Sequence, residues 1–344
     1  MLQVDFLATQ AHYIDHIAPI WDALDEENVG TFYVPKSLIG HAQWKLKHHL
    51  YLFSYEDNTP ETYGVNPMLV CAYGDMKYAH RVNPERKIIM MEHGTGHGFG
   101  TSAYPNGPGD RDLVSLFLPP NQYTADKIHT VRDTRCEVIG TPKLDWVNNY
   151  HFQRSNPPVV CISFHHGTKN RRPPEASSAF EHYKDHVEQL KKMSNEYHFH
   201  LIAHGHPLSR VRDVPFYASV GVPFLEEFTD VMKLADVYVN DLSSTLYEFM
   251  STGKPVVVLN APWFRRDVQH GLRFWDYADV GMEVNSPEEL LPAIEATLRT
   301  PSLFLRQRHK AIRDLYPYLG QSALHAANVL HEYLLEEVDV QSKR

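Results

Sequence analysis

The chain has 344 residues, of which 43% are hydrophobic and 22% charged, a balance typical of a folded globular protein. Its net charge of −9 argues against a protein that coats nucleic acid or anionic lipid, because such binding needs a basic surface. No apolar run reaches the roughly 18 residues of a membrane-spanning helix, and the N-terminus does not resemble a secretory signal. The three cysteines, Cys71, Cys136 and Cys161, are odd in number and far apart, which predicts free thiols in a cytoplasmic protein.

In the first half of the chain, short apolar runs alternate with segments whose apolar residues recur at helical spacing. Residues 11–25 place apolar side chains at helical spacing, which predicts the first helix. Strands are predicted over residues 4–9, 30–34, 67–72, 87–91 and 113–118, and residues 138–140 close this half. Because strands that alternate with helices form parallel sheets, we expect a Rossmann-like, acceptor-side domain over residues 1–150.

The second half repeats the same alternation after a polar segment, residues 151–158, that predicts a linker. Strands are predicted over residues 159–164, 198–203, 236–240 and 255–260, and helices over residues 179–196, 287–299 and 322–338. We expect a nucleotide-donor-binding Rossmann-like domain over residues 151–320 and a C-terminal helix, 321–344, that packs on the first domain. The predicted fold is therefore α/β, with two Rossmann-like domains facing across a cleft that collects ligands at the carboxyl ends of the strands.

The most informative motif follows the strand predicted at residues 236–240. Hydroxyl and carboxylate side chains begin a short helix there, and Gly253 is placed to end it. A helix N-terminus just beyond a strand binds anions, because its N–H groups are unpaired and its dipole is positive. The alternative is a plain capping motif. We predict a seat for a donor diphosphate, with ribose at the carboxylate one turn deeper, formed by Asp241, Ser243, Ser244, Thr245 and Glu248.

Histidines follow two other predicted strands. His93 comes directly after residues 87–91 and opens a glycine-rich loop, so it is predicted to deprotonate an acceptor hydroxyl, with His97 as the alternative base. His206 follows residues 198–203 and is predicted to assist at the donor phosphates or the leaving group. Another interpretation is that His93 is a turn histidine held by the backbone.

Metal and phosphate-loop motifs are incomplete in this sequence. Although His-x-His pairs occur near residue 200, there is no H-E-x-x-H or C-x-x-C pattern, so no metal is predicted. Lys169 lies in a Gly-Thr-Lys segment that lacks the full P-loop pattern. Lys169 and Arg265 are predicted to neutralise the diphosphate, and the alternative is that both are solvated loop charges.

These motifs in this order resemble those of the GT-B superfamily. Residues 240–255 resemble the donor-binding motif of CDP-glycerol glycerophosphotransferases and are similar to that of UDP-N-acetylglucosamine 2-epimerases. Glu92-His-Gly-Thr95 resembles the His-Gly-Thr loop of the former, and residues 138–145 resemble the Gly-x-Pro-x-x-Asp segment of both. The resemblance implies the diphosphate at Ser243 and Ser244, the ribose at Glu248, His93 as base, His206 at the phosphates, and no metal.

The sequence departs from both groups in ways that favour an acceptor in solution. Membrane-working glycerophosphotransferases carry a basic surface, whereas this chain is acidic, and the acidic catalytic residues of the epimerases have no secure counterpart here. The leading hypothesis is therefore a glycosyltransferase-type enzyme that moves a sugar, or glycerol phosphate, from a nucleoside-diphosphate donor to a hydroxyl of a soluble acceptor. It needs no cofactor beyond that donor, and His12 and His97 are assigned to the acceptor side.

Three alternatives remain open at this point. The first is a UDP-sugar 2-epimerase, and the second is a nucleotide- or carbohydrate-binding module without turnover. The third is a viral-type glycosyltransferase that acts on hydroxymethylated DNA bases, so that the acceptor is a polymer or modified DNA. The third requires a local basic face, for which the candidates are Lys45, Lys47, His48 and His49.

Overall fold

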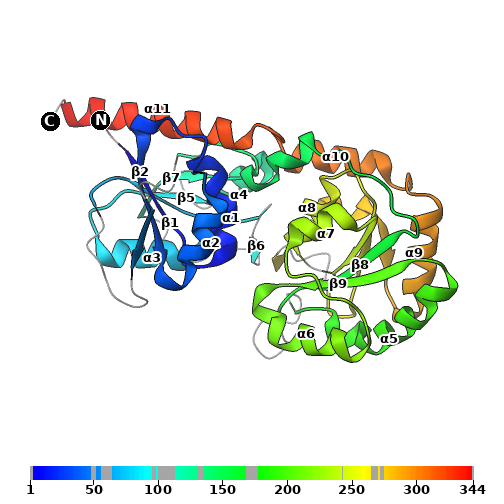
Figure 1. The fold of residues 1–344 in the computed structure, drawn as a ribbon. Coiled ribbons are helices and arrows are strands. Elements are labelled where there is room, and N and C mark those ends of the chain that lie inside the picture. The colour runs from blue at the N-terminus through cyan, green and yellow to red at the C-terminus, as the bar shows by residue number, and fades with distance from the viewer. Residues whose placement is uncertain are drawn as a thin grey trace. The chain divides into compact units, whose positions relative to one another are not determined.

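The computed structural model describes residues 3–47, 52–55, 64–94, 98–99, 113–129, 135–167, 177–241, 243–264, 270–271 and 275–342. The chain divides into two compact units (Figure 1). Unit 1 comprises Met1–His97, Ser102–Asn149 and Asp314–Arg344, and unit 2 comprises Gly98–Thr101 and Tyr150–Arg313. Apart from the short segment Gly98–Thr101, the chain therefore enters unit 2 at Tyr150 and returns to unit 1 at Asp314.

Unit 1 contains a six-stranded parallel sheet with the strand order β3-β2-β1-β4-β5-β7. Every residue of β1, β4 and β5 is buried, as expected for strands that are covered on both faces. The strands are β1 (Val4–Leu7), β2 (Val29–Pro35), β3 (Leu52–Tyr55), β4 (Met68–Val70), β5 (Ile88–Met91) and β7 (Val114–Leu118). The helices are α1 (Ala11–Trp21), α2 (Ile39–Lys45), α3 (Tyr73–Val82), α4 (Gln122–His129) and α11 (Ser322–Ser342), with shorter turns η1 (Glu26–Asn28), η2 (Lys36–Leu38) and η4 (Pro142–Asn149).

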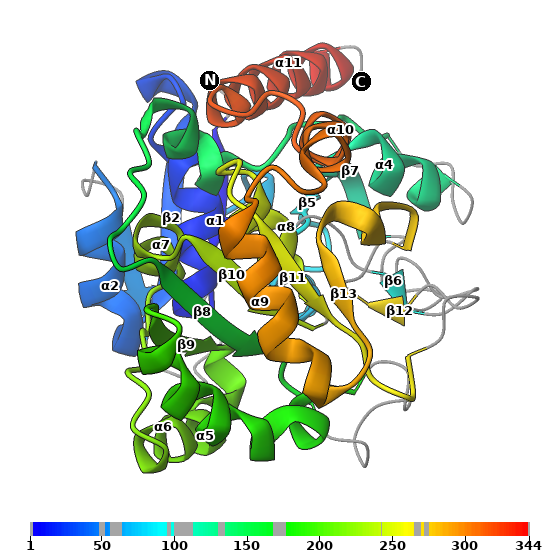
Figure 2. The ribbon, with the colours of Figure 1, turned by 90° about the vertical axis from the view of Figure 1, so that its right-hand side faces the viewer.

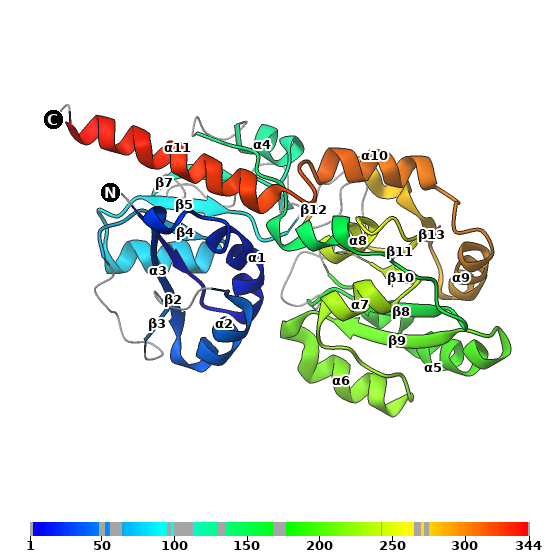
Figure 3. The same ribbon diagram turned by 45° about the horizontal axis from the view of Figure 1, so that its top comes forward.

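Helix α11 lies against unit 1 although it is the last element of the chain (Figure 3). Leu330 and Leu334 of α11 share a buried core with Ile14 and Ile17 of α1. The carboxylate of Asp145, in η4, accepts hydrogen bonds from the backbone N–H groups of Gly320 (3.0 Å), Ser322 (3.0 Å) and Ala323 (2.7 Å). Asp145 thus caps the N-terminus of α11.

The backbone conformation and close packing of Gly140 require a glycine at the first position of the Gly-x-Pro-x-x-Asp segment. Gly140 has φ +80°, and a Cβ there would lie 2.4 Å from the carbonyl oxygen of Pro317, so no other residue fits without a shift. The Gly-x-Pro-x-x-Asp segment therefore fixes the C-terminal helix to unit 1.

Unit 2 contains a five-stranded parallel sheet with the strand order β13-β11-β10-β8-β9 (Figure 2). The strands are β8 (Val159–Phe164), β9 (His200–Gly205), β10 (Val237–Asn240), β11 (Val256–Leu259) and β13 (Met282–Val284), and β6 (Gly98–Phe99) pairs antiparallel with β12 (His270–Gly271). The helices are α5 (Phe180–Glu196), α6 (Arg210–Ser219), α7 (Phe228–Leu234), α8 (Ser244–Met250), α9 (Leu290–Arg299) and α10 (Leu305–Leu315), with turns η6 (Pro207–Ser209), η7 (Trp275–Val280) and η8 (Pro287–Glu289).

The prediction of two Rossmann-like α/β domains is confirmed. Some predicted boundaries are wrong. The strand predicted from residue 198 begins at His200, because His198 has a left-handed φ of 54° that an extended strand excludes. Residues 138–140 form no strand, and the helix predicted over residues 287–299 begins as η8 before α9. Within the described residues, no helix is both long and apolar enough to cross a bilayer.

Candidate functional site

Three neighbouring strands of unit 2 deliver the predicted donor-side residues to one edge of the sheet. β8 lies between β9 and β10, and all three are parallel, so their carboxyl ends meet at the same edge. His206 follows β9, His165 and His166 follow β8, and Asp241 follows β10 directly before α8. The prediction that residues near 241 begin a helix just beyond a strand is confirmed.

Asp241 is fully buried and holds the loops of this edge together. Its carboxylate accepts hydrogen bonds from the backbone N–H groups of His165 (2.8 Å) and Ala179 (2.7 Å) and from the hydroxyl of Ser178 (3.2 Å). These bonds tie the ends of β8 and β10 to the start of α5. The carboxylate therefore positions its neighbours, and a direct contact between Asp241 and a donor stays a prediction.

A chain of hydroxyl groups begins helix α8. Ser243 is the N-cap residue, and its Oγ accepts from the backbone N–H (3.3 Å) and the hydroxyl (2.9 Å) of Thr245. The Thr245 hydroxyl also lies 2.9 Å from the Tyr238 hydroxyl. Because the Ser243 oxygen accepts both bonds from Thr245, its own proton can be donated to an anion. Ser244, the first helical residue, is half-buried.

Glu248 lies one turn further into α8, as the spacing predicts, and is almost completely buried, with 1% of its surface exposed. Contact between Glu248 and a ribose stays a prediction. Lys169, Arg265 and His97, which complete the predicted site, lie outside the described residues.

His206 is held in one tautomer by the backbone. Its Nδ1 accepts a hydrogen bond from the N–H of Leu208 (3.1 Å), so in the neutral ring the proton sits on Nε2. The ring lies 4.0 Å from that of His166 and 5.8 Å from that of His165, measured between centroids. His165 and His166 were not among the predicted site residues, although their position directly after a predicted strand was the available signal.

Unit 1 holds His93 in the opposite tautomer. His93 follows β5, and its Nδ1 lies 2.7 Å from the carbonyl oxygen of Cys71, which follows the neighbouring strand β4. A carbonyl oxygen can only accept, so in the neutral ring Nδ1 carries the proton and Nε2 carries the lone pair. This arrangement suits a general base that acts through Nε2.

Three other rings lie near His93, and an ammonium group lies beside one of them. The ring centroids of Tyr13, His16 and His12 lie 5.1, 6.0 and 6.1 Å from its own. Lys143 Nζ, from η4, lies 3.3 Å from His16 Nε2. Burial, and then the charge of Lys143, lower the pKa of His12 to about 4, against the opposing charge of Asp15.

His16 and Lys143 were not predicted as site residues. The spacing of His12 and His16, four residues apart on α1, was the signal, because it places both rings on one helix face. The sequence around Lys143 did not indicate a site residue, because η4 comes to lie beside α1 only in the folded chain. Among the described residues no group of three or more histidine, cysteine, aspartate or glutamate side chains is arranged to hold a metal ion.

The basic face required by the DNA-modifying alternative is partly neutralised. Lys45 Nζ lies 3.0 Å and His41 Nε2 3.2 Å from the carboxylate of Asp15. Lys47 is exposed two residues beyond the end of α2, and His48 and His49 lie outside the described residues. The charge of Lys45 is therefore largely offset within the protein.

No protein-family model matches the chain, and no curated protein matches it in sequence. Its structure is similar to that of the wall teichoic acid polymerase TagF soaked with CDPG, with a TM-score of 0.68 and 12% identity over 98% of this chain and 90% of that chain. It is also similar to MnaA of S. aureus in a co-structure with UDP, with a TM-score of 0.64 and 15% identity over 97% of both chains.

A third similar structure is UDP-GlcNAc 2-epimerase from Neisseria meningitidis bound to UDP-GlcNAc, with a TM-score of 0.61 and 13% identity over 98% of this chain and 100% of that chain. At such identities, likeness in structure establishes the fold. The chain therefore has the GT-B-like fold, with two Rossmann-like domains, that these structures share.

Proposed function

We propose that the chain is a GT-B transferase that moves a sugar or a glycerol phosphate from a nucleoside-diphosphate donor to a hydroxyl of a soluble acceptor. The GT-B-like fold supports the proposal, since the similar structures include a polymerase soaked with CDPG and proteins with bound UDP or UDP-GlcNAc. The observation that carries it is the pair of backbone-fixed tautomers. His93 offers a lone pair at Nε2, whereas His206 offers an N–H at the same ring position.

The reaction needs both kinds of imidazole. The acceptor oxygen forms a bond to the donor's sugar carbon while its proton passes to His93 Nε2. The bond from that carbon to the diphosphate oxygen breaks, and the nucleoside diphosphate leaves with the extra negative charge. For a CDP-glycerol donor, the acceptor oxygen attacks the phosphorus that bears glycerol, and CMP leaves. In both cases His206 Nε2–H, the Ser243 hydroxyl and the start of α8 donate to the departing oxygens. The proposed reaction requires the two edges to meet at a shared substrate.

Two asparagine substitutions test the roles separately. The side-chain amide that His93→Asn introduces can still donate to the Cys71 carbonyl but has no group at the position of Nε2. We expect kcat to fall by about 10²- to 10⁴-fold with donor affinity unchanged. The amide oxygen that His206→Asn introduces can still accept from Leu208 N–H, but the Nε2–H donor is lost, so we expect weaker donor binding.

A thermal-shift screen of nucleoside diphosphates, UDP-sugars and CDP-glycerol identifies the donor first, and calorimetry then measures its affinity for each variant. If no such compound binds, the proposal fails. Full turnover by His93→Asn would show that His93 is not the base, while the donor site would stand. Normal donor affinity in His206→Asn would show that His206 does not bind the donor phosphates.

A UDP-sugar 2-epimerase is the second candidate. The Neisseria epimerase supports it, because the likeness covers the whole of that chain. An epimerase converts its substrate without an acceptor, so incubation with UDP-GlcNAc alone and analysis of the sugar separates the two candidates. Appearance of the 2-epimer would favour this candidate over the transferase.

A further inference from the structure

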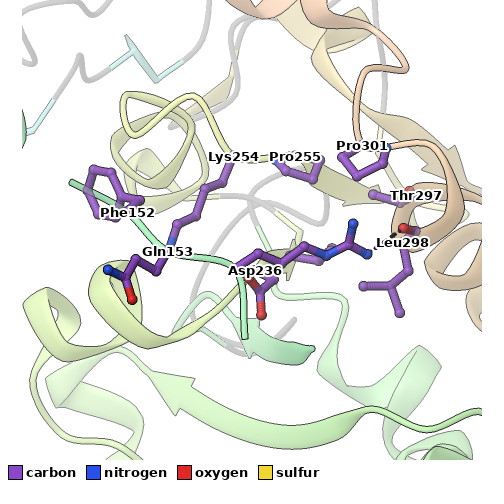
Figure 4. Close-up of a pocket in the computed structure, with 10 residues that line it drawn as sticks. Phe152, Gln153, Asp236, Lys254, Pro255, Thr297, Leu298 and Pro301 are labelled. Atoms are coloured by element: carbon purple, nitrogen blue, oxygen red, sulfur yellow. Dashed lines mark hydrogen bonds between the residues drawn. The ribbon is translucent and has the colours of Figure 1, made fainter. Parts of the chain in front are cut away.

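A pocket of unit 2, drawn in Figure 4, is lined by groups that the fold already uses. The ammonium group of Lys254 donates to three backbone carbonyl oxygens near the end of α7, those of Met232 (3.0 Å), Lys233 (3.2 Å) and Ala235 (2.7 Å). It therefore closes that helix, and its protons are not available to a ligand. Helix α2 of unit 1 differs, because the fold does not use part of its exposed face.

A tryptophan lies on the surface of α2, which packs beside α1 (Figure 3). Trp44 is 67% exposed, whereas Trp21 is 1% exposed and lies in the core. Lys45 Nζ lies 4.2 Å from the centroid of the Trp44 indole, and the carboxylate of Asp15 holds this ammonium group at 3.0 Å. One face of the indole thus carries a fixed cation, and so large an exposed fraction requires the other face to be open to solvent. Exposed apolar surface of this size costs free energy, which a stacked ligand recovers.

Gly40 keeps the surface beside the indole open. It is exposed and lies four residues before Trp44 in α2, hence on the same face of the helix. The indole leans toward this turn, since its ring centroid lies 5.8 Å from that of His41. A Cβ at Gly40 would meet no heavy atom within 4 Å. A ligand on the indole therefore meets no side chain at this position.

Two hydrogen-bonding groups at this face have no partner among the described residues. They are the side-chain amide of Gln43, which is exposed, and the indole N–H of Trp44. The amide offers donors and an acceptor, and the indole offers a donor. A hydroxyl both donates and accepts, so the hydroxyls of a stacked ligand match both groups.

The apolar area of the face is too small for a protein partner. Trp44 is the one large exposed apolar side chain of α2, and a whole aromatic side chain covers roughly 150–250 Å². A stable protein interface buries about 800 Å² on each partner. The face therefore suits a ligand that is about one ring wide.

The charges around the face balance. The charge of Lys45 is offset by Asp15, and the backbone N–H of Lys47, two residues beyond α2, donates to the carboxylate of Asp22 (3.0 Å). Two lysines and two aspartates thus lie together among the described residues of this surface. A neutral ligand matches this balance better than a nucleic acid or an anionic lipid surface, since both of those need an excess of cations.

We propose that this face, formed by Gly40, Gln43 and Trp44, binds a pyranose unit of a neutral carbohydrate. A pyranose with equatorial hydroxyls presents a face of C–H groups, which stacks on the negative π-face of the indole. Its hydroxyls pair with the Gln43 amide and the indole N–H. Asp15, which holds Lys45, lies one turn from His12 on α1, so we assign the bound sugar to a distal unit of the acceptor. Only this assignment rests on the proposed function.

Cellopentaose is the probe, because its β-linked glucose units are neutral and carry equatorial hydroxyls. We expect saturable binding to the full chain without any donor, with a Kd in the millimolar range by calorimetry. Tryptophan emission should shift to shorter wavelength as the indole leaves water. Sorbitol, which has the hydroxyls but no ring, should show no saturation. Equal binding of the two compounds, or no saturation by cellopentaose at several times the expected Kd, would overturn the proposal.

Variants locate the site. Trp44→Ala should weaken cellopentaose binding at least about tenfold. Gly40→Leu fills the space beside the indole on a helix that leucine favours, so it should weaken binding as much without loss of stability. Tyr197→Ala, which removes a 44% exposed aromatic ring from unit 2, is the matched control and should leave the Kd unchanged. An unchanged Kd in either α2 variant would refute the assignment.

Two further measurements separate the alternatives. If sedimentation showed a dimer of the wild-type chain that Trp44→Ala dissociates, the face would be an interface between copies and the proposal would fail. Once a donor is identified, Trp44→Ala should raise the KM for an oligosaccharide acceptor and leave kcat unchanged. An unchanged KM would detach the sugar site from the acceptor path, whereas absence of turnover in the wild type would count against the proposed function and not against the sugar site.

Discussion

The two histidines assigned to catalysis differ in the ring nitrogen that carries the proton, and the main chain decides which it is. The partner of His93 is a carbonyl, and the partner of His206 is an N–H group. The sequence predicted both as histidines at strand ends, because an apolar run directly precedes each. It could not predict the tautomers, since the Cys71 carbonyl is 22 residues from His93 and is brought there only by the pairing of β4 with β5.

His12 makes unit 1 sensitive to acid. Its pKa is about 4 in the folded chain, below the ordinary value of 6.5, so between these pH values the unfolded state binds the extra proton. The stability associated with neutral His12 is complete above pH 6.5 and is lost as the pH falls towards 4. After allowance for its partial exposure, His12→Gln should remove about 2 kcal/mol of the stability loss between pH 7 and 4.

Urea unfolding at these two pH values measures the effect of His12→Gln. His151→Gln, at an exposed position, is the control and should unfold like the wild type at both. An acid sensitivity that is the same in His12→Gln and in the wild type would contradict the assignment.

The titration of Asp75 changes the stability of the folded chain with pH in the opposite direction to that of His12. Burial raises its pKa to about 6, although hydrogen bonds from the hydroxyl and the N–H of Thr9 favour the carboxylate. The folded state therefore binds more protons between pH 4 and 6, and the stability due to protonated Asp75 is present at low pH and lost as the pH rises through 6. Asp75→Asn should be more stable than the wild type at pH 7 by about 1–3 kcal/mol.

Urea unfolding also tests this prediction, with the exposed Glu196→Gln as the control. The gain should shrink as the pH approaches 4, where the wild-type carboxyl is already neutral. If Asp75→Asn were less stable than the wild type at pH 7, the interpretation would be wrong.

At the scale of elements, the sequence predicted the central strands best. β5 and β11 are short uninterrupted apolar runs, β8 and β10 each contain one polar residue near their end, and every residue of β10 and β11 is buried. The edge strands β7 and β9 were predicted, whereas the edge strands β3 and β13, which are only four and three residues long and each contain a polar residue, were not. Helix α6 was not predicted either.

The capping of α11 by Asp145 becomes evident only in the folded chain, because the two are far apart in the sequence. Asp145→Ala removes the acceptor of three backbone N–H groups from the start of α11. Such a cap contributes roughly 1–2 kcal/mol, and its charge adds to this at a helix N-terminus. We expect a loss of about 2–3 kcal/mol in the free energy of unfolding, measured by urea titration.

Asp185→Ala, on the exposed side of α5, is the matched control and should change stability by less than about 0.5 kcal/mol. A cap role would be excluded if both variants lost the same small amount. Asp145→Asn retains one acceptor oxygen and should fall between Asp145→Ala and the wild type.

At the scale of the molecule, the candidate residues gather at one sheet edge in each unit, and the sequence predicted this because parallel strands share the direction of their carboxyl ends. The partners of Asp241 could not be predicted, since Ala179 is 62 residues away and His165 is 76. For the same reason Lys143 was missed beside His16, from which it is separated by 127 residues. Strand ends are therefore readable from sequence, whereas the contacts that orient side chains there depend on long-range packing.

Because unit 2 is proposed to bind the donor and unit 1 the acceptor, the proposal predicts which backbone amides a bound donor protects from hydrogen exchange. A nucleoside diphosphate at about a hundred times its Kd should stabilise the folded state by roughly 2.7 kcal/mol. Since the proposed diphosphate site lies wholly in unit 2, amide hydrogen exchange should slow at the start of α8 and after β8 and β9, with little change around His93. His206→Asn, compared at equal occupancy, should show weaker protection after β9 and unchanged protection at α8. Protection confined to residues 9–16 and 91–94 of unit 1 would mean that the nucleotide binds at the edge assigned to the acceptor, and the roles of the two units would have to be exchanged.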